Sequence, residues 1–300
     1  MIDGALLLDK PVGLSSNTAL QEAKRLLAAK KAGHGGTLDP LASGLLVVLF
    51  GEATKFAGPM LEADKEYLAT LKLGQRTATG DAEGAIVETH PVSVSAEGVA
   101  KALARFHGEI EQVPPMHSAL KHEGVPLYKI ARQGGIVERK ARRVVIHELE
   151  LLARKGDLLE IRARVSKGTY IRTLAEDIGA ALGCGAHLAA LRRTGSGRFS
   201  LRDAVTLDEL RESPDRRTKL RPLASLLEGL PRTELDAASE ARLRNGQSLK
   251  ISDVREGVRA LYRLDGAVIG LAYSAPEGVL KALRLTQAAE KSVKIAGSKI

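Results

Sequence analysis

The sequence is poor in aromatic residues and nearly free of cysteine. Aromatic side chains make up 3% of its 300 residues, tryptophan is absent, and Cys184 is the single cysteine. One cysteine excludes both an intrachain disulfide and a cysteine-based metal cluster, and it suits a reducing cytoplasm. We therefore expect a cytoplasmic protein with a core of Leu, Val, Ile and Ala, in which each tyrosine is informative.

Long apolar runs and nucleotide-binding fingerprints are also missing. The sequence contains no stretch of 18 apolar residues and no signal-peptide architecture at its N-terminus, so we expect neither membrane insertion nor secretion. Neither of the glycine motifs G-x-x-x-x-G-K-[ST] and G-x-G-x-x-G occurs, and no recognisable cluster of metal ligands is present. We expect a protein that uses no cofactor and no metal.

Positive charge is plentiful and concentrated. The net charge is +9 and the pI is about 9.6. Residues 121–172 contain thirteen Lys and Arg against six Asp and Glu, which gives +7, so the other 248 residues carry only +2. This distribution predicts a polyanionic partner, with the basic segment as a surface that faces nucleic acid.

A glycine-rich stretch, AGHGGTLDPLASG at 32–44, stands out as a candidate site. It surrounds one His and one Asp with four glycines, which allow positive φ and close approach of another molecule. Pro40 disfavours a helical conformation for the residue before it, so Asp39 should lie at a turn on a loop between two packed elements. A purely structural turn and a phosphate-binding loop are the alternatives.

Hydrophobic periodicity predicts an α+β protein with a mixed, mostly antiparallel sheet flanked by helices. The expected helices begin near Thr18 and Thr173, both at capping-box spacing, and also cover 95–106. The Asp265-Gly266 pair predicts a tight hairpin of two loop residues. The expected strands are 5–8, 67–73, 85–89, 143–152, 158–165, 259–264, 267–273 and 279–285, with a short one at 118–121. The apolar run 45–50 and the segments 188–193 and 195–200 complete the catalytic unit.

Two units are expected. A catalytic unit should cover residues 1–230, with a polar loop at 74–84 and a basic insertion at about 122–142. A small β-rich unit should cover 231–300, and its last ten residues should be frayed. A monomer is the default expectation.

Eight segments, taken together, resemble the tRNA pseudouridine synthase B family of bacteria. Their order and spacing match over roughly residues 3–200, which is far more specific than any one motif. The segments are LLLDKPVGLSS (6–16), GHGGTLDPLASG (33–44), GEATKF (51–56), KEY (65–67), LGQRTATGDAEG (73–84), PPMHSALK (114–121), KGTYIRT (167–173) and GCGAHLAALRR (183–193). The unit at 231–300 is similar, more weakly, to the PUA-type RNA-binding domain of that family.

The resemblance implies the pseudouridine synthase fold and an activity. The family isomerises uridine 55 of the tRNA T arm to pseudouridine after flipping the base out of the RNA. It also implies roles for seven residues: Asp39 as the essential carboxylate, Tyr67 stacking on the flipped base, Tyr170 and Arg172 beside the carboxylate, Leu191 lining the pocket, His34 extruding and replacing the base, and Lys10 bordering the site. Two positions depart from the pattern, Gly35 in place of Thr and His117 in place of Tyr, and we expect neither to touch the reaction centre.

The chemistry agrees with these residues. Pseudouridine formation is an isomerisation, so it needs no cofactor, but it needs an ionised carboxylate that can attack C1′, attack C6 or deprotonate C2′. Burial alone would raise the pKa of Asp39, and a nearby guanidinium, for which Arg172 is the candidate, would lower it. Extruding the base costs a few kcal/mol, which stacking on Tyr67 and Tyr170 would offset. Tyr67, water and Asp39 are all candidates for the base that deprotonates C5.

Two other functions stay open at this point. One is a tRNA-binding or tRNA-folding chaperone with little or no catalysis, against which the joint presence of Asp39, Tyr67, Tyr170 and Arg172 argues. The other is an enzyme that binds a phosphorylated small molecule at the glycine loop, for which neither the basic segment nor the β-rich unit would be needed.

Overall fold

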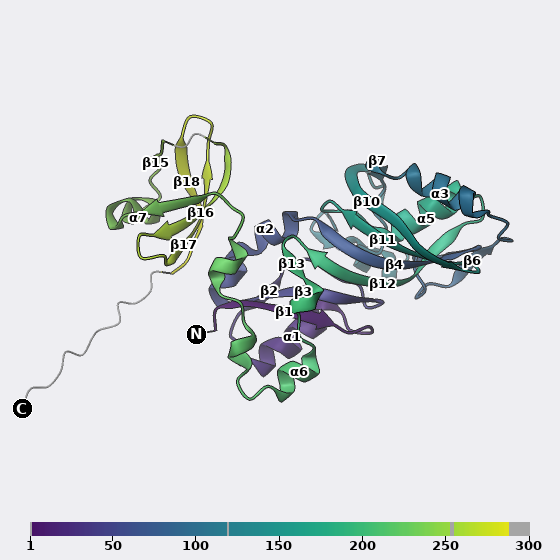
Figure 1. Cartoon of the computed structure of the whole chain (residues 1–300), viewed down its shortest axis with the longest axis horizontal. Coiled ribbons are helices and arrows are strands. Elements are labelled where there is room, and N and C mark those ends of the chain that lie inside the picture. The colour runs from purple at the N-terminus through teal and green to yellow at the C-terminus, as the bar shows by residue number, and fades with distance from the viewer. Residues whose placement is uncertain (1, 119, 253–254, 288–300) are drawn as a thin grey trace, which may run out of the picture.

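A nine-stranded mixed sheet forms the centre of the protein, as the computed structural model of residues 2–118, 120–252 and 255–287 shows (Figure 1). The path through the sheet is β1-β3-β12-β4-β11-β10-β7, with β2 against β3 and β13 against β12. β3 and β12 run parallel, and every other pair is antiparallel. The strands are β1 (Gly4–Lys10), β2 (Ala32–His34), β3 (Ala42–Phe50), β4 (Lys65–Leu73), β7 (Gly108–Gln112), β10 (Arg142–Lys155), β11 (Leu158–Val165), β12 (Ala186–Ser196) and β13 (Phe199–Ser200).

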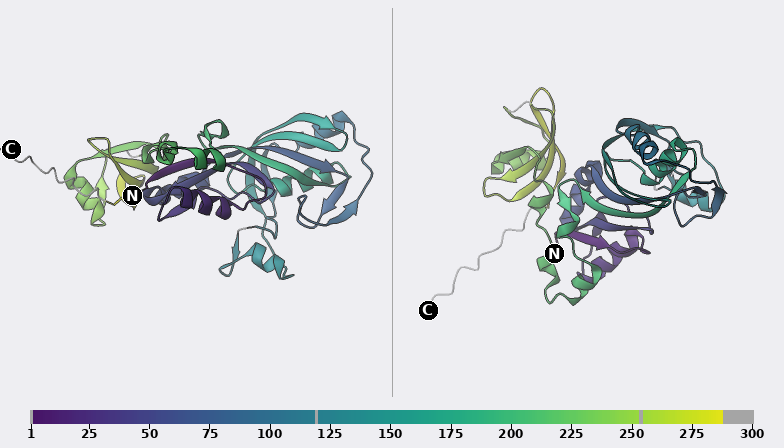
Figure 2. Two further views of the ribbon diagram at one scale, coloured as in Figure 1. Left: turned by 90° about the horizontal axis from the view of Figure 1, so that it is seen from below. Right: turned by 45° about the vertical axis from the view of Figure 1, so that its right-hand side comes forward.

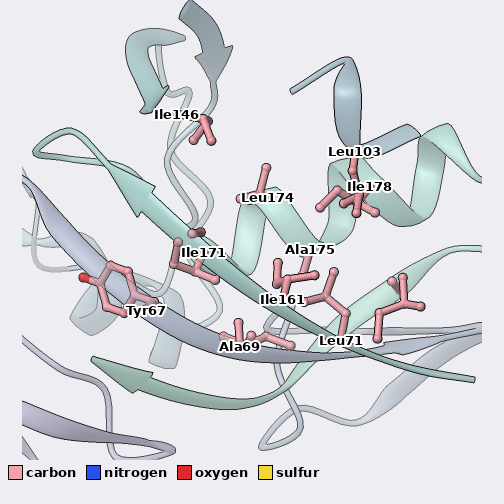
Figure 3. Close-up of a cluster of buried hydrophobic side chains, with 14 of the residues drawn as sticks. Tyr67, Ala69, Leu71, Leu103, Ile146, Ile161, Ile171, Leu174, Ala175 and Ile178 are labelled. Atoms are coloured by element: carbon pink, nitrogen blue, oxygen red, sulfur yellow. The ribbon is translucent and has the colours of Figure 1, made fainter. Parts of the chain in front are cut away.

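Helices cover the sheet because each carries an apolar face. In Figure 3, Leu174, Ala175 and Ile178 of α5 lie against the side chains of β4 and β11, and Leu103 of α3 lies beside Ile178. A second cluster packs α1 and α6 against β1 and β3. The helices are α1 (Ser16–Leu26), α2 (Ala57–Glu62), α3 (Ala96–Ala104), α4 (Leu127–Arg132), α5 (Ile171–Ala181), α6 (Leu207–Glu212) and α7 (Ala237–Arg244), and the 3₁₀ helices are η1 (Gly51–Phe56), η2 (Leu201–Asp203), η3 (Arg216–Lys219) and η4 (Leu223–Leu226).

The predicted starts of two helices are wrong. α1 begins at Ser16, two residues earlier than expected, because the Ser15 hydroxyl accepts a hydrogen bond from the Thr18 amide and caps the helix. α5 begins at Ile171, so Thr173 lies inside the helix and does not cap it. Capping-box spacing therefore marked the correct helices but placed their first turns two residues late.

The segment between β7 and β10 projects from the sheet (Figure 2, left). Gln112 pairs with Arg142, so the excursion is longer than the 122–142 insertion expected from the sequence. It contains β8 (Lys121–His122), β9 (Val125–Pro126) and α4. The predicted polar loop at 74–84 also contains a strand, β5 (Gln75–Thr77), which pairs with β6 (Ile86–Thr89).

A second sheet follows, with the order β14-β16-β17-β18-β15. The connection between β16 and β17 has four residues, Leu264–Ala267, in place of the two expected, because both strands stop short of the turn. The expectation that the last ten residues are frayed concerns residues outside the described part of the chain. The strands are β14 (Arg232–Leu235), β15 (Leu249–Lys250), β16 (Gly257–Arg263), β17 (Val268–Ser274) and β18 (Val279–Leu285).

The two sheets share a hydrophobic core. Leu45 and Phe56 of the central sheet region belong to the same buried cluster as Leu226, Tyr262 and Leu271. Polar contacts join the units as well. The Lys55 ammonium donates to the carbonyl of Leu285 at 2.9 Å, and the Glu52 carboxylate accepts from the Gln287 amide at 2.6 Å.

Candidate active site

Asp39 lies on the loop between β2 and β3, at the turn that the sequence predicts. The amide of Ala42 donates to the Asp39 carbonyl at 3.1 Å, which closes this turn. Ser16 holds the preceding residue: its hydroxyl both donates to the Leu38 carbonyl and accepts from the Leu38 amide. On the other side, the Gly13 amide donates to the Pro40 carbonyl at 2.8 Å. The loop is therefore tied to the segment that begins α1.

Arg172 joins two carboxylates. Its Nη2 lies 3.0 Å from Oδ2 of Asp39, and its Nη1 lies 3.4 Å from Oδ2 of Asp81. The guanidinium also donates to the carbonyls of His117, at 2.6 Å, and Thr79, at 3.3 Å. The Arg172 side chain is only 7% exposed. Its position in the first turn of α5 is electrostatically unfavourable, and the two carboxylates offset this.

Burial is the largest influence on the pKa of Asp39. Its pKa is raised, first because the surrounding protein removes water from the carboxylate, and the charge of Asp81 raises it further. Arg172, Lys10 and His117 oppose this change. Although 43% of the side chain is still accessible at the mouth of the site, the loss of water outweighs the guanidinium. The expectation that Arg172 lies beside Asp39 is met, but Arg172 does not bring the pKa of Asp39 below its ordinary value.

Five of the predicted site residues line one cavity of about 310 Å³. Asp39 comes from the β2–β3 loop, Tyr67 from β4, Leu191 from β12, and Tyr170 and Arg172 from the start of α5. Tyr67 is 9% exposed, and Figure 3 shows its ring at the end of the cluster of apolar side chains. Burial raises the pKa of the Tyr170 phenol.

A polar residue that the sequence analysis did not single out, Gln112, holds Tyr170. The side chain of Gln112, which is 2% exposed, accepts from the Tyr170 amide at 3.0 Å and donates to its carbonyl at 3.3 Å. Ser118 also lines the cavity and is buried, and its hydroxyl lowers the pKa of the Tyr170 phenol slightly against the effect of burial.

Two buried cations that line the same cavity, Arg193 and Lys65, were missed as well. Arg193 is 2% exposed and donates to the carbonyls of Leu45, Thr37 and Gly36. Lys65 is 8% exposed and donates to three carbonyls at the end of α2, those of Met60, Leu61 and Ala63. Burial lowers the pKa of Lys65 to about 8. Both residues belong to quoted motifs, KEY and LRR, but nothing in those patterns shows that the side chains bind backbone carbonyls.

His34 and Lys10 do not line this cavity. His34 lies in β2 and pairs with Val48 of β3. Burial lowers the pKa of its imidazole, and Arg193 lowers it further by a smaller amount. The Lys10 ammonium is buried and donates to the carbonyls of Pro11 and Leu14. Burial lowers its pKa to about 8, and the Asp39 charge opposes that shift. The structure therefore places Lys10 within the electrostatic influence of Asp39 but not in the cavity wall.

The two departures from the family pattern have local explanations. A Cβ atom on Gly35 would lie 2.7 Å from Cβ of Met60, so a larger side chain here requires a different arrangement of α2. The expectation that His117 stays clear of the reaction centre is wrong for its backbone, because the His117 carbonyl accepts from Arg172.

The basic segment splits into two parts. Four cations of β10 and β11 pair with neighbouring carboxylates: Arg143 with Glu109, Lys155 with Glu160, Arg162 with Glu150 and Arg164 with Glu148. Within the described residues, the structure shows no carboxylate within 4.0 Å of five cations in the projecting segment and at the start of β10. These are Lys121, Lys129, Arg132, Lys140 and Arg142.

No helix within residues 2–118, 120–252 and 255–287 is long and apolar enough to cross a membrane. In that same part of the chain, no group of three or more His, Cys, Asp and Glu side chains could hold a metal ion.

Comparison with known proteins agrees with this geometry. Residues 24–171, which contain Asp39, match the model of the TruB family pseudouridylate synthase N-terminal domain. Residues 172–229 match the tRNA pseudouridylate synthase B C-terminal domain. A tRNA pseudouridine synthase B from Burkholderia lata is 57% identical over 294 residues, covering 95% of this chain and 90% of the relative. The chain belongs to the TruB family of pseudouridylate synthases.

Further matches support this family and its fold. A tRNA pseudouridine synthase B from an Azoarcus species is 55% identical over 264 residues, 87% of this chain and 88% of the relative. A chain in the crystal structure of a Cbf5-Nop10-Gar1 complex superposes with a TM-score of 0.74 at 27% identity, covering 95% of this chain and 85% of that one. A chain in an H/ACA RNP bound to a substrate RNA containing 2′-deoxyuridine gives 0.73 at 26% identity, with 94% and 84% covered. The predicted fold class is confirmed, and the protein is an isomerase of the kind that modifies tRNA.

Proposed function

We propose that the protein isomerises uridine 55 in the T arm of tRNA to pseudouridine, with Asp39 as the catalytic carboxylate. The observation that carries the proposal is the contact between Asp39 and Arg172 at the wall of a cavity that two tyrosines also line. A cavity of about 310 Å³ is at the small end of the range for ligand sites, about 300–1,000 Å³, and suits one nucleoside.

The reaction breaks the N1–C1′ bond, turns the uracil and forms a C5–C1′ bond. The proton on C5 leaves and N1 gains a proton, so no atoms are added to or lost from the uridine overall. Asp39 starts the reaction as a carboxylate, by attack on C1′ or C6 or by removal of a C2′ proton. Arg172 stabilises the ionised form, since its guanidinium lowers the pKa of Asp39. Because no group is supplied from outside, the enzyme needs no cofactor.

The remaining predicted residues act on the uridine once it has left the RNA helix. Tyr67 and Tyr170 present rings on which the base stacks, which offsets the cost of flipping by roughly 1–3 kcal/mol for each ring. Leu191 lines the cavity on the β12 side. Tyr67, water and Asp39 are the candidates for the base that removes the C5 proton. His34 fills the gap that the base leaves in the RNA, and Lys10 supports the edge of the site.

Phosphate contacts come from the projecting segment and the C-terminal unit. The unpaired cations Lys121, Lys129, Arg132, Lys140 and Arg142 are suited to the phosphates of the T arm, whose folded shape and exposed loop bases are then recognised. The unit at 231–300 is PUA-like and binds RNA outside the T loop. The protein works in the cytoplasm, where tRNA is processed, and as a monomer.

The test is release of tritium from T-arm RNA that carries [5-³H]uridine only at position 55. Wild-type protein and Asp157→Asn, which removes a carboxylate paired with Lys72 on the surface, should release tritium. Asp39→Asn and Asp39→Ala should bind the RNA and release none. An active Asp39→Asn variant would place the chemistry on another residue. A wild-type protein that binds the RNA and releases nothing would support a tRNA-binding or tRNA-folding role in its place.

A further inference from the structure

Arg193 is a buried cation whose partners are all backbone carbonyls. It lies on β12, next to Tyr67 of β4 in the sheet. Its Nε donates to the carbonyl of Leu45 at 2.7 Å, its Nη2 to that of Gly36 at 3.1 Å and its Nη1 to that of Thr37 at 3.3 Å. Among the described residues the structure shows no carboxylate within 4.0 Å of this guanidinium.

Such an arrangement has to be explained, because a buried charge without an opposite charge is expensive. Three carbonyls offset part of that cost. A neutral side chain of similar length would fill the same space without the cost of burying a charge. The three acceptors lie on the two sides of Asp39 along the chain. Gly36 and Thr37 precede Asp39 on its loop, and Leu45 follows it in β3. The guanidinium therefore spans the two stems of the loop that carries Asp39.

The strand pairing brings Arg193 to this place. β12 runs parallel to β3 with Arg193 opposite Gly44. The approach is so close that a Cβ atom on Gly44 would lie 2.3 Å from the Arg193 carbonyl oxygen. Ser16 holds Leu38 and Gly13 holds Pro40, but each of those contacts reaches only one side of the loop. Of the three ties, Arg193 is the one that reaches both stems.

We infer that Arg193 is a positioning residue for the reaction: its guanidinium fixes the separation of the two loop stems and thereby holds Asp39 at its distance from Arg172. This inference rests on the proposed role of Asp39. Lysine should not replace Arg193, because an ammonium is a single point of charge, whereas the planar guanidinium has donors that point in several fixed directions.

The test compares Arg193→Lys with Arg211→Lys. Arg211 is an exposed arginine on α6 that pairs with Glu22, so it offers the same substitution far from the loop. The measurements are RNA affinity and the single-turnover rate of tritium release at saturating T-arm RNA, as a function of pH. For Arg193→Lys we expect a rate roughly 10- to 100-fold lower, since small misplacements of a catalytic group have effects of that size. RNA affinity should change by less than about threefold, because no phosphate contact is lost.

The pH profile separates positioning from a general loss of structure. Arg172 lowers the pKa of Asp39, while burial and Asp81 raise it, with Lys10 and His117 assisting Arg172. If Asp39 drifts from Arg172, its pKa rises, so the acidic limb of the profile should move to higher pH in Arg193→Lys. The limb should not move in Arg211→Lys. An unchanged rate and an unchanged limb in Arg193→Lys would overturn the inference, as would a loss confined to RNA affinity.

A second variant covers the case in which Arg193→Lys does not fold. Gly36 has a φ of +144° and a Cβ atom there would lie 3.5 Å from Nη1 of Arg193. The added atom would make only an ordinary contact, but an L side chain rarely adopts this φ, so Gly36→Ala strains the backbone whose carbonyl Arg193 binds and keeps the buried charge. It should also reduce the rate and move the acidic limb to higher pH, and wild-type behaviour would refute the link. Wild-type protein without tritium release would instead overturn the proposed function itself.

Discussion

At the scale of single residues, the balance between burial and Arg172 decides at which pH Asp39 is ionised. Burial raises the pKa of Asp39 and Arg172 lowers it. In Arg172→Gln the lowering contribution is lost, so the pKa should rise further. Because the reaction requires the carboxylate, the rate should then fall at a higher pH than in the wild type, and activity at neutral pH should drop. The single-turnover rate of tritium release, measured against pH, tests this.

The control for that experiment is Arg162→Gln, which removes an exposed guanidinium paired with Glu150. Its acidic limb should coincide with that of the wild type. If the acidic limb of Arg172→Gln coincides with the limbs of the wild type and of Arg162→Gln, the ionisation of Asp39 does not limit the reaction.

The lowered pKa of Lys65 leads to a prediction about stability. Its pKa falls from 10.5 to about 8 in the folded protein, mainly through burial. Between these values the unfolded chain holds a proton that the folded protein lacks, so the free energy of unfolding rises with pH in this window. At about 1.4 kcal/mol per pKa unit the contribution is at most on the order of 3 kcal/mol. Below pH 8 this contribution is absent.

Denaturant unfolding at a series of pH values checks this. In Lys65→Met the free energy of unfolding should no longer rise between pH 8 and 10.5. The stability of the wild type relative to the variant should therefore grow across this pH range. Lys72→Met, on the same strand but only half-buried and paired with Asp157, should keep the rise. Equal pH dependence in the two variants would show that the Lys65 ammonium is not the group responsible.

The site was predictable where family motifs name the residue that does the chemistry. Asp39, Tyr67, Tyr170, Arg172 and Leu191 meet in one cavity, as the resemblance implied. Their roles in the reaction stay predictions.

The site residues that the sequence analysis missed were missed for a common physical reason. Arg193, Lys65 and Gln112 bind backbone carbonyls or amides, and the identity of a backbone partner leaves no trace in a sequence pattern. Asp81 was part of a quoted motif, but only the fold shows that it shares Arg172 with Asp39.

At the scale of elements, periodicity located the strands well and helix starts less well. The strand at 279–285 matches β18 fully, and 67–73 lies within β4. β5 was missed because it has only three residues, which is too short for alternation to show. The start of α1 was set by a local hydrogen bond to the Ser15 cap, which the capping-box spacing of Thr18 concealed, whereas α5 begins after Tyr170 with no side-chain cap.

The parallel contact between β3 and β12 leads to a prediction about Gly44. Its φ is +98°, and an added Cβ atom would meet the Arg193 backbone at 2.3 Å. Gly44→Ala should therefore destabilise the protein by more than the roughly 1 kcal/mol expected from an unfavourable φ alone. Gly108 has a comparable φ of +91° with nothing within 4 Å of the added atom, so Gly108→Ala should show only the conformational cost. Denaturant unfolding compares the two, and equal losses would mean that the clash is relieved by local movement.

At the scale of the whole molecule, charge counted along the chain misjudged the surface. The excess at 121–172 is continuous in sequence, but the fold uses much of it in cross-strand ion pairs on β10 and β11. Strand pairing sets which charges face each other, so a count along the chain cannot separate paired cations from unpaired ones. Of the cations at 121–172, Lys121, Lys129, Arg132 and Lys140 lie in the projecting segment without a carboxylate within 4.0 Å among the described residues, so this surface is smaller than the sequence indicated.

The shared core predicts that the two sheets unfold together. Leu271 of β17 packs in the cluster that contains Leu45 and Phe56, whereas Ile269 of the same strand packs within the C-terminal unit. Each should cost roughly 2–5 kcal/mol when changed to alanine. If the units form one cooperative structure, Leu271→Ala and Ile269→Ala should each lower the midpoint of a single calorimetric transition. Two transitions, with Ile269→Ala lowering one and leaving the other in place, would show that the C-terminal unit folds independently of the sheet that carries Asp39.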